Sequence, residues 1–217
     1  MKTSNSIIAA TVAVCVAGLF LNAFQLKKMY LVTDWEDLYR DCVKQEIPNV
    51  QALYFEVMDN AEGWQSETIT ILRGDRYLFA TPDTSLVELI PTDSGLVVRS
   101  KTMHLKAFVI LPELVLVEAV NRENVLIDGF DCDTLTLRAD AQANIRLKCC
   151  HINCLSVQSV GGRVEIHDNN TVADAEVRLR NGEFYADDIA CHTLTFDADT
   201  TSSVTLRGRS IIHAANR

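Results

Sequence analysis

A repeat dominates the second half of this sequence. From Leu116 onward, short apolar-x-apolar pairs recur as two interleaved series. The first series begins at Leu116 and steps by 19, 20, 22 and 17 residues, and the second begins at Val125 and steps by 20, 19, 20 and 20. The pairs begin at Leu116, Val125, Leu135, Ile145, Leu155, Val164, Val177, Phe184, Leu194 and Val204. A unit that recurs about every twenty residues is typical of a solenoid.

Each pair has the alternation of a strand with one wet and one dry face, as where Thr136 separates Leu135 from Leu137. Two such strands per unit cannot bury their apolar side alone, but stacked units can. We therefore predict an all-β fold with a parallel β-helix, or solenoid, of about five two-stranded rungs over residues 113–217. A β-sandwich of hairpins is the alternative. It is less favoured because hairpin turns of the Asn-Gly or Asp-Gly kind are few.

Residues 49–112 show no twenty-residue period, although short apolar stretches alternate there with turn signals such as Gly74-Asp75 and Pro82-Asp83. The expected strands are Ala52 to Val57, Thr68 to Leu72, Tyr77 to Ala80, Leu86 to Ile90, Leu96 to Arg99 and Leu105 to Leu111. We expect them to form a small antiparallel sheet that caps the open end of the solenoid, because a stack needs protected edges.

The N-terminal residues 1–28 are predicted to be a membrane anchor or an uncleaved signal. The stretch Ile7 to Phe24 is apolar, long enough to approach a bilayer span, and longer than a usual signal-peptide core. We expect this transmembrane helix to make the inner membrane a partner of the chain, although Lys2 on one side and Lys27 and Lys28 on the other leave its orientation open. Residues 29–48 are predicted to be a membrane-proximal amphipathic segment, with a helix from Thr33 to Glu46.

Composition excludes some partners. The formal net charge is -9, and the basic residues are scattered among acidic ones, so nucleic-acid binding is not expected. The seven cysteines are an odd number, which does not suit a disulfide framework. The cluster Cys149-Cys150-His151-x-x-Cys154 lacks the second short-spaced pair that zinc usually takes, so no metal or cofactor is expected and the cysteines are interpreted as corner-filling residues.

The outward positions of the predicted strands supply the candidate binding residues. They would form a ladder of polar side chains across the stacked rungs, able to contact an extended polymer or the flat face of a partner protein. The candidates are Arg138, Gln158, Arg178, Arg180 and Asp197. No catalytic residue is predicted.

Two stretches resemble a known family. ITILRGDRYLFATPDTSLVELIPTDSGLVVRSK (residues 69–101) and LKAFVILPELVLVEAVNRENVLIDGFDCDTLTLRADAQANIRL (residues 105–147) are similar to the auto-transporter adhesin "head GIN" domain family. The N-terminal Lys2-Thr3-Ser4-Asn5 and the later Lys27-Lys28-Met29-Tyr30 resemble membrane-anchored members from Bacteroidetes-type bacteria. The chain departs from the family's frequent Gly-Ser-Gly-Asp corners, for example at Ala139 to Asn144. The resemblance implies export, a solenoid, no known catalytic residues and no established ligand.

Three functions follow as hypotheses. The first is a non-enzymatic, membrane-anchored module in the periplasm that binds an envelope protein or glycan. The second is a polysaccharide-processing enzyme whose acids would come from Asp131/Asp133, Asp187/Asp188 or Asp197/Asp199, with His167 or His192. The third is a cytoplasm-facing thiol sensor that uses Cys149 to Cys154. We favour the first. The oligomeric state is left open.

Overall fold

The computed structural model describes residues 38–58, 68–102, 105–167, 169–208 and 214–216. The chain divides into two compact units, Met1–Asp41 and Cys42–Arg217, and every described strand belongs to the second unit. The predicted anchor, Ile7 to Phe24, lies outside the described residues. Within the described ranges, no helix has the length and apolar character needed to cross a membrane.

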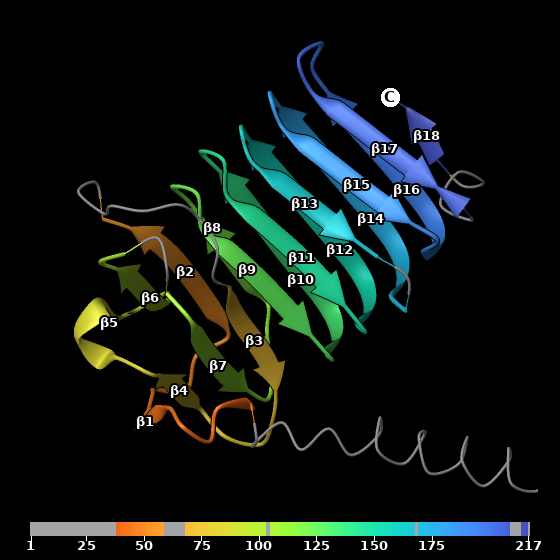
Figure 1. The fold of residues 1–217 in the computed structure, drawn as a ribbon. Coiled ribbons are helices and arrows are strands. Elements are labelled where there is room, and N and C mark those ends of the chain that lie inside the picture. The colour runs from red at the N-terminus through yellow and green to blue at the C-terminus, as the bar shows by residue number, and fades with distance from the viewer. Residues whose placement is uncertain (1–37, 59–67, 103–104, 168, 209–213, 217) are drawn as a thin grey trace, which may run out of the picture. The chain divides into compact units, whose positions relative to one another are not determined.

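Two nine-stranded sheets, A and B, make up the second unit (Figure 1). In spatial order, sheet A contains β1 (Val43–Glu46), β4 (Leu78–Thr81), β7 (Ala107–Leu111), β3 (Ile69–Arg73), β9 (Asn124–Asp128), β11 (Asn144–Lys148), β13 (Arg163–Ile166), β15 (Glu183–Asp187) and β17 (Ser203–Arg207). Sheet B contains β18 (Ala214–Asn216), β16 (Ala190–Ala198), β14 (Thr171–Arg180), β12 (His151–Val160), β10 (Asp131–Asp140), β8 (Leu116–Ala119), β2 (Ala52–Val57), β6 (Gly95–Ser100) and β5 (Val87–Thr92). A short 3-10 helix, η1 (Thr84–Leu86), precedes β5.

From β8 onward the chain passes alternately through sheet B and sheet A, and each strand pairs in parallel with the strand two further along. This arrangement confirms the predicted β-solenoid. The second predicted series is in register throughout. Its residues occupy one inward column of sheet A: Val125, Ile145, Val164, Phe184 and Val204.

The first predicted series is wrong at two places. Leu116 pairs with Thr136, so that Val117, rather than Leu116, lies inward beside Leu137. Ala175 is the residue that pairs with Leu155, and Val177 belongs to the next inward column. The uneven steps of 22 and 17 therefore came from selecting large apolar residues, whereas an alanine fills that column in β14.

The antiparallel cap is only partly correct. Strands β1, β4 and β5 pair antiparallel with their neighbours. However, β2 pairs in parallel with both β6 and β8, and β3 pairs in parallel with both β7 and β9. The parallel stack therefore begins well before residue 113. The first rungs could not be recognised in the sequence, because strands that are neighbours there are separated by long stretches of chain of unequal length.

The helix predicted from Thr33 to Glu46 is wrong for its last eight residues: residues 39–42 form a turn and a bend, and Val43–Glu46 form β1. Strand β1 hydrogen-bonds along β4, with Val43 opposite Thr81 and Glu46 opposite Leu78. An edge strand offers a row of backbone donors and acceptors, and pairing with it can override a weak helical preference. Residues 33–37 lie outside the described part of the chain.

One continuous apolar core lies between the two sheets and extends from Ile47 to Phe196. Most of its side chains are Leu, Ile, Val and Ala, with Phe55, Phe130 and Phe184 among the largest that are fully buried. Burying one such side chain contributes about 1.5–3 kcal/mol. The same core runs through the irregular first rungs and the repeating rungs, so both belong to one packed structure.

Left-handed backbone conformations mark the corners between the sheets. One corner places such a residue in each rung at intervals of 19 or 20 residues: Gly129, Cys149, Asn169, Asp188 and Gly208. On the opposite side, Ala141 and Gln142 adopt positive φ angles of 48° and 69°, a conformation that favours glycine. A residue other than glycine in this conformation costs about 1–2 kcal/mol. The corner geometry is therefore kept without the glycine-rich sequence.

Candidate functional site

The outer face of sheet B carries the predicted binding ladder. Arg138, Gln158, Arg178 and Asp197 pair across β10, β12, β14 and β16 and form one straight column. Neighbouring strands in a sheet lie about 4.8 Å apart, so the column presents a side chain at that interval. Arg180 lies two residues further along β14, beside Val160. The structure thus brings four predicted residues into one column and places the fifth next to it.

Each arginine of this ladder already has a carboxylate partner. The closest nitrogen–oxygen distances are 3.2 Å for Arg138–Glu118, 2.8 Å for Arg178–Glu176 and 2.8 Å for Arg180–Asp197. The hydrogen bond from Arg180 lowers the pKa of Asp197 below its ordinary value. Because these charges are balanced within the sheet, the ladder does not offer unpaired positive charge to a polyanion.

Two adjacent hollows lie beside the ladder on the same strands. The first has a volume of about 440 Å³ and lies over the middle of β10, β12, β14 and β16. Its outward side chains are Thr134, Thr136, Cys154, Ser156, Asp174, Glu176, Thr193 and Thr195. The second has a volume of about 490 Å³ and lies over the starts of β12, β14 and β16. Its outward side chains include His151, Asn153, Thr171, Ala173 and His192. We call the two hollows together the sheet-B trough.

A break in the strand alternation lies where the two hollows meet. In β12, Asn153 and Cys154 are consecutive exposed residues, and His192 and Thr193 are exposed together in β16. The same break occurs in β10, so the feature continues from rung to rung. A regular strand would turn one residue of each such pair inward. The irregular stretch therefore exposes additional polar side chains along the trough.

The polar atoms of the trough come from hydroxyl, amide, imidazole and carboxylate groups, and apolar side chains such as Ile189 and Ala175 contribute to the rest of its lining. The described residues that line it include no Lys or Arg. Some groups are already hydrogen-bonded: Asn153 donates to Asp133 at 2.9 Å, and His151 Nδ1 is bonded to the Thr171 hydroxyl. The hydrogen-bond donors and acceptors that the remaining hydroxyl groups offer can bind a ligand rich in hydroxyl groups. The trough was missed from the sequence because it depends on the irregular strand geometry.

The side chains of Cys149, Cys150 and Cys154 do not meet at one site. Cys149 is exposed at a corner with a φ angle of 52°, Cys150 is fully buried, and Cys154 is exposed in the trough. Burial raises the pKa of Cys150 to about 11, so this thiol stays protonated. Among the described residues, no three His, Cys, Asp or Glu side chains lie close enough together to hold a metal ion.

The acidic pairs considered for an enzyme are engaged in local contacts. Asp199 accepts hydrogen bonds from Ser202 and Thr201, and the Ser202 bond is the main reason that its pKa falls to about 2. Asp188 is a left-handed corner residue. Asp131 lies 4.0 Å from Arg73, and Asp133 accepts from Asn153. These contacts fit corner and rim roles better than a pair of carboxylates that divides acid and base catalysis.

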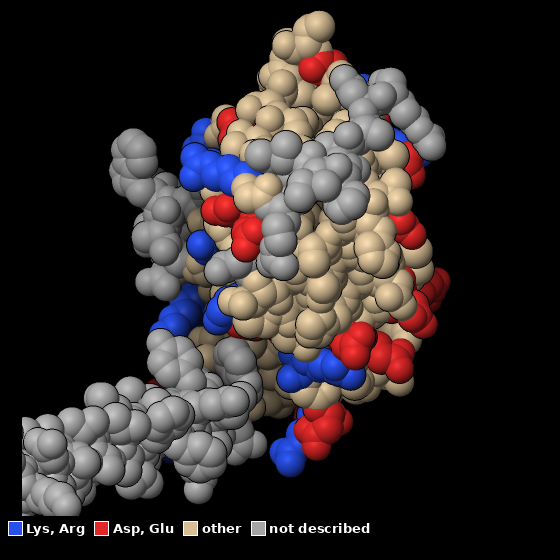
Figure 2. Space-filling view, turned by 90° about the vertical axis from the view of Figure 1, so that its right-hand side faces the viewer, with Lys and Arg blue, Asp and Glu red and all other residues tan. Residues whose placement is uncertain are grey.

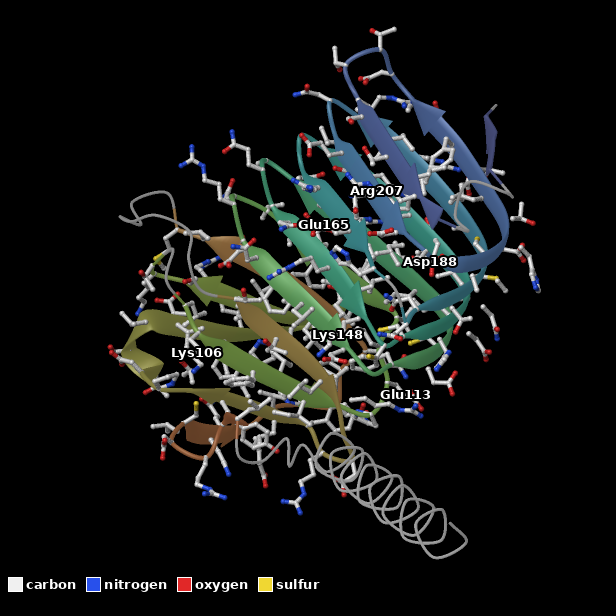
Figure 3. All side chains as sticks on the ribbon, turned by 45° about the vertical axis from the view of Figure 1, so that its right-hand side comes forward. Lys106, Glu113, Lys148, Glu165, Asp188 and Arg207 are labelled. Atoms are coloured by element: carbon white, nitrogen blue, oxygen red, sulfur yellow. The ribbon has the colours of Figure 1, made fainter. Side chains whose placement is uncertain are left out.

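Sheet A carries a second polar cluster around Glu165, which is labelled with Arg207 in Figure 3. His167 Nε2 lies 3.2 Å from the Glu165 carboxylate. Tyr185 donates to Asp187 at 3.0 Å, and the Arg207 guanidinium lies 5.4 Å from the centre of the Tyr185 ring. Acidic and basic groups satisfy one another here, and the cluster lies on the opposite sheet from the trough.

Glu123 was not singled out from the sequence. Its side chain is only 7% exposed, and Oε1 has no hydrogen-bond partner. Burial raises the pKa of this carboxyl to about 7, although a hydrogen bond from the Asn124 backbone opposes the shift. Glu123 occupies the corner column of Ala143 and Gly162. Aligning the rungs at twenty-residue spacing could have revealed this acid among small residues.

The comparisons with known proteins do not identify the chain. No protein-family model matches it, and no curated protein matches it. Two crystal structures show a distant similarity. A "putative adhesin" from Bacteroides fragilis is 11% identical with a TM-score of 0.45, over 81% of this chain and 94% of that one. A "putative lipid binding protein" from Parabacteroides distasonis is 12% identical with a TM-score of 0.39, over 80% and 96%.

Similarity at this level does not allow a function to be transferred from either structure. The resemblance to the "head GIN" family therefore stays a prediction.

Proposed function

We propose that this chain is a non-catalytic binding module that holds an extended, neutral, hydroxyl-rich polymer in the sheet-B trough. A glycan of the bacterial envelope is the class of ligand with this chemistry. The observation that carries the proposal is the trough itself, a pair of hollows shared by three or four rungs. Its polar lining consists of Thr, Ser, Asn and His together with Asp174 and Glu176.

Repetition supports a polymer over a small molecule. Column neighbours such as Thr136 and Ser156 present hydroxyl groups from successive strands. The spacing of strands in a sheet, about 4.8 Å, is comparable to the length of one sugar unit in an extended chain. The column continues with Glu176 and Thr195, so a polymer lying across the strands would meet a side-chain oxygen at each unit.

Charge supports a neutral ligand. The ladder arginines are paired with acids, and the hollows contain Asp174 and Glu176 but no described cation. An anionic polymer would have to displace these ion pairs before it gained any attraction. Hydrogen bonds to hydroxyl groups need no such rearrangement.

The cellular setting is part of the proposal. The apolar stretch Ile7 to Phe24 would anchor the chain in the inner membrane, with the solenoid in the periplasm. A compartment-dependent reporter fused after Arg217 tests this placement. A cytoplasmic signal would contradict it and would favour the thiol-sensor hypothesis, for which Cys149 and Cys154 are both exposed.

A binding screen tests the ligand class. The full chain in mild detergent is titrated with a panel of neutral and charged polysaccharides, alongside Thr136→Trp, which fills the trough. Thr70→Trp is the matched control, because Thr70 is a similarly half-buried outward threonine on sheet A. We expect a neutral glycan to bind, at least tenfold weaker binding by Thr136→Trp, and unchanged binding by Thr70→Trp. Binding of polyanions alone, or of no polymer, would contradict the proposal.

A further inference from the structure

The outer face of sheet B carries exposed apolar side chains where the repeating rungs meet the first rungs. The outward row that contains Thr136 in the trough continues in register to Leu116 on β8 and Ala52 on β2. Both residues are partly exposed, and Val115, which precedes Leu116, is 42% exposed. Aliphatic side chains therefore replace hydroxyl groups on the strands next to the trough.

Tyr54 lies in the neighbouring outward row, which runs from Arg138 through Glu118 to β2. The residues before and after it, Leu53 and Phe55, are at most 1% exposed, whereas Tyr54 is partly exposed. Strand alternation thus places the Tyr54 ring on the outer face of sheet B, two strands away from β10 and the trough.

Tyr54, Leu116 and Val115 together form a surface that we call the apolar shelf. Tyr54 lies opposite Glu118, which is two residues along β8 from Leu116, so the aromatic and aliphatic side chains share one face of paired strands. Exposed apolar side chains that gather in one place, beside polar ones, are typical of a binding surface.

The charged groups around the shelf are paired. Glu118 lies 3.2 Å from Arg138, and Glu56, two residues along β2 from Tyr54, lies 2.5 Å from Arg99. Such pairing is also seen elsewhere on the molecule. Figure 2, viewed from the side on which β17 lies in Figure 1, shows acidic and basic side chains next to each other at several places along the margin. The shelf therefore offers an apolar contact and no free charge, which suits a neutral ligand.

We infer that the apolar shelf extends the binding site of the trough, and that Tyr54 stacks on one ring of the bound polymer. This inference rests on the proposed function. A sugar ring has hydroxyl groups at its edge and C–H groups on its faces, so it suits a site that combines a hydroxyl-lined trough with an aromatic surface. Tyrosine supplies a large, amphipathic contact area and often contributes strongly to binding.

The register sets the length of ligand that reaches the shelf. The trough presents a row of side chains from β10, β12, β14 and β16, and β8 and β2 extend this row. At about 4.8 Å per strand, the row is about 14 Å long over the trough and about 24 Å long from β16 to β2. With one sugar unit per strand, about four units fill the trough and about six reach Tyr54.

A series of oligosaccharides of increasing length tests the inference. Oligosaccharides of two to eight units are cut from the neutral polysaccharide of the panel that binds best. Their dissociation constants for the full chain in mild detergent are measured by calorimetry. For the wild type, we expect the affinity to rise at least about fivefold between four and six units. For Tyr54→Thr, it should stay nearly level over this interval, whereas binding of the four-unit oligosaccharide should be unchanged.

Three further variants complete the design. Tyr54→Phe keeps the ring and should retain the rise in affinity, which separates stacking from the loss of a hydroxyl group. Leu116→Thr, at the other side of the shelf, should reduce the rise. Tyr185→Thr is the matched control, because Tyr185 is a partly exposed outward tyrosine on sheet A, and it should behave as the wild type. Circular dichroism spectra check that each variant is folded.

The results distinguish this inference from the proposed function. An equal rise in affinity with length for the wild type and Tyr54→Thr, or no rise beyond four units in the wild type, would overturn the role of the shelf and leave the trough as the binding site. Failure of every oligosaccharide to bind would contradict the proposed function, and this inference with it.

Discussion

The rungs that precede Leu116 and the rungs that follow it share one core but are connected differently. After Leu116, rung neighbours are about twenty residues apart, as Glu118 and Arg138 are. Before it, the paired residues Glu56 and Arg99 are 43 residues apart, and β3 lies between β7 and β9. The apolar cluster nevertheless continues through both regions. Parallel stacking therefore requires a matching inward pattern but not a constant period.

Removing core side chains tests whether the two regions form one structure. Phe55→Ala in the first rungs and Leu137→Ala in the repeating rungs should each lower the free energy of unfolding by about 2–5 kcal/mol, because both side chains are at most 1% exposed. Val204→Ala, at 36% exposure, should cost less than about 1 kcal/mol. Urea denaturation followed by circular dichroism should show one shared transition. Two separate transitions would mean that the regions unfold independently.

The buried carboxyl of Glu123, in the repeating rungs, should make the free energy of unfolding depend on pH. Its pKa is raised from 4.5 to about 7, so between these pH values the carboxyl is protonated in the folded state and ionised in the unfolded state. The stability of the wild type should therefore fall as pH rises from about 4.5 to about 7. Glu123→Gln should remove this loss and be more stable above pH 7 by about 3 kcal/mol.

The measurement is the free energy of unfolding across this pH range. The exposed Glu113, which accepts a hydrogen bond from Gln51, provides the control Glu113→Gln. Equal pH profiles for the wild type and Glu123→Gln would show that burial of this carboxyl does not affect stability.

Gly95 in the first rungs and Gly129 in the repeating rungs should differ in how well they tolerate a larger side chain. A Cβ atom at Gly95 would lie 2.3 Å from the Ala52 carbonyl oxygen, where β6 meets β2. Gly95→Ala should therefore cost about 2 kcal/mol or more. A Cβ at Gly129 would have no atom within 4 Å, and Asn169 and Asp188 occupy the same corner position in later rungs. Gly129→Asn should cost less than about 1 kcal/mol. Thermal melting compares them, and an equal loss for both would refute the distinction.

Removing a surface ion pair should give the smallest difference in stability between the two regions. Arg99 lies 2.5 Å from Glu56 and 3.8 Å from Glu88, and so connects a parallel rung to the antiparallel strand β5. Arg138 contacts only Glu118 among the ion pairs found in the described chain. Removing Arg99 should cost up to about 1 kcal/mol, and removing Arg138 less than about 0.5 kcal/mol. Denaturation in low and high salt checks both values, and a larger loss for Arg138→Ala would reverse the expected order.

The sequence was sufficient to predict the repeating rungs because alternation and spacing are visible in it. The column from Val125 to Val204 was predicted residue by residue. Errors arose where a small residue such as Ala175 fills an inward position, or where Val117 and not Leu116 turns inward. The parallel pairing of β2 and β3 could not be predicted, because their partners are set by tertiary contacts across insertions of unequal length.

The candidate site was predicted only in part. Alternation alone placed Arg138, Gln158, Arg178 and Asp197 in one outward column. The ion pairs that these residues form with acids on the same sheet depend on side-chain positions. Because of these pairs, the trough and not the ladder is the candidate binding site. The hollows depend on consecutive exposed residues such as Asn153 and Cys154, which a strict strand pattern does not anticipate.

Hydrogen–deuterium exchange with a bound neutral polysaccharide tests the central claim most directly. We predict that the best-binding glycan of the panel will slow exchange in peptides from β10, β12, β14 and β16, where residues of the trough lie. Peptides from β11, β13 and β15 on sheet A should be unchanged, and Thr136→Trp should abolish the protection. Protection centred on sheet A, or no protection with any glycan, would contradict the assignment of the trough as the binding site.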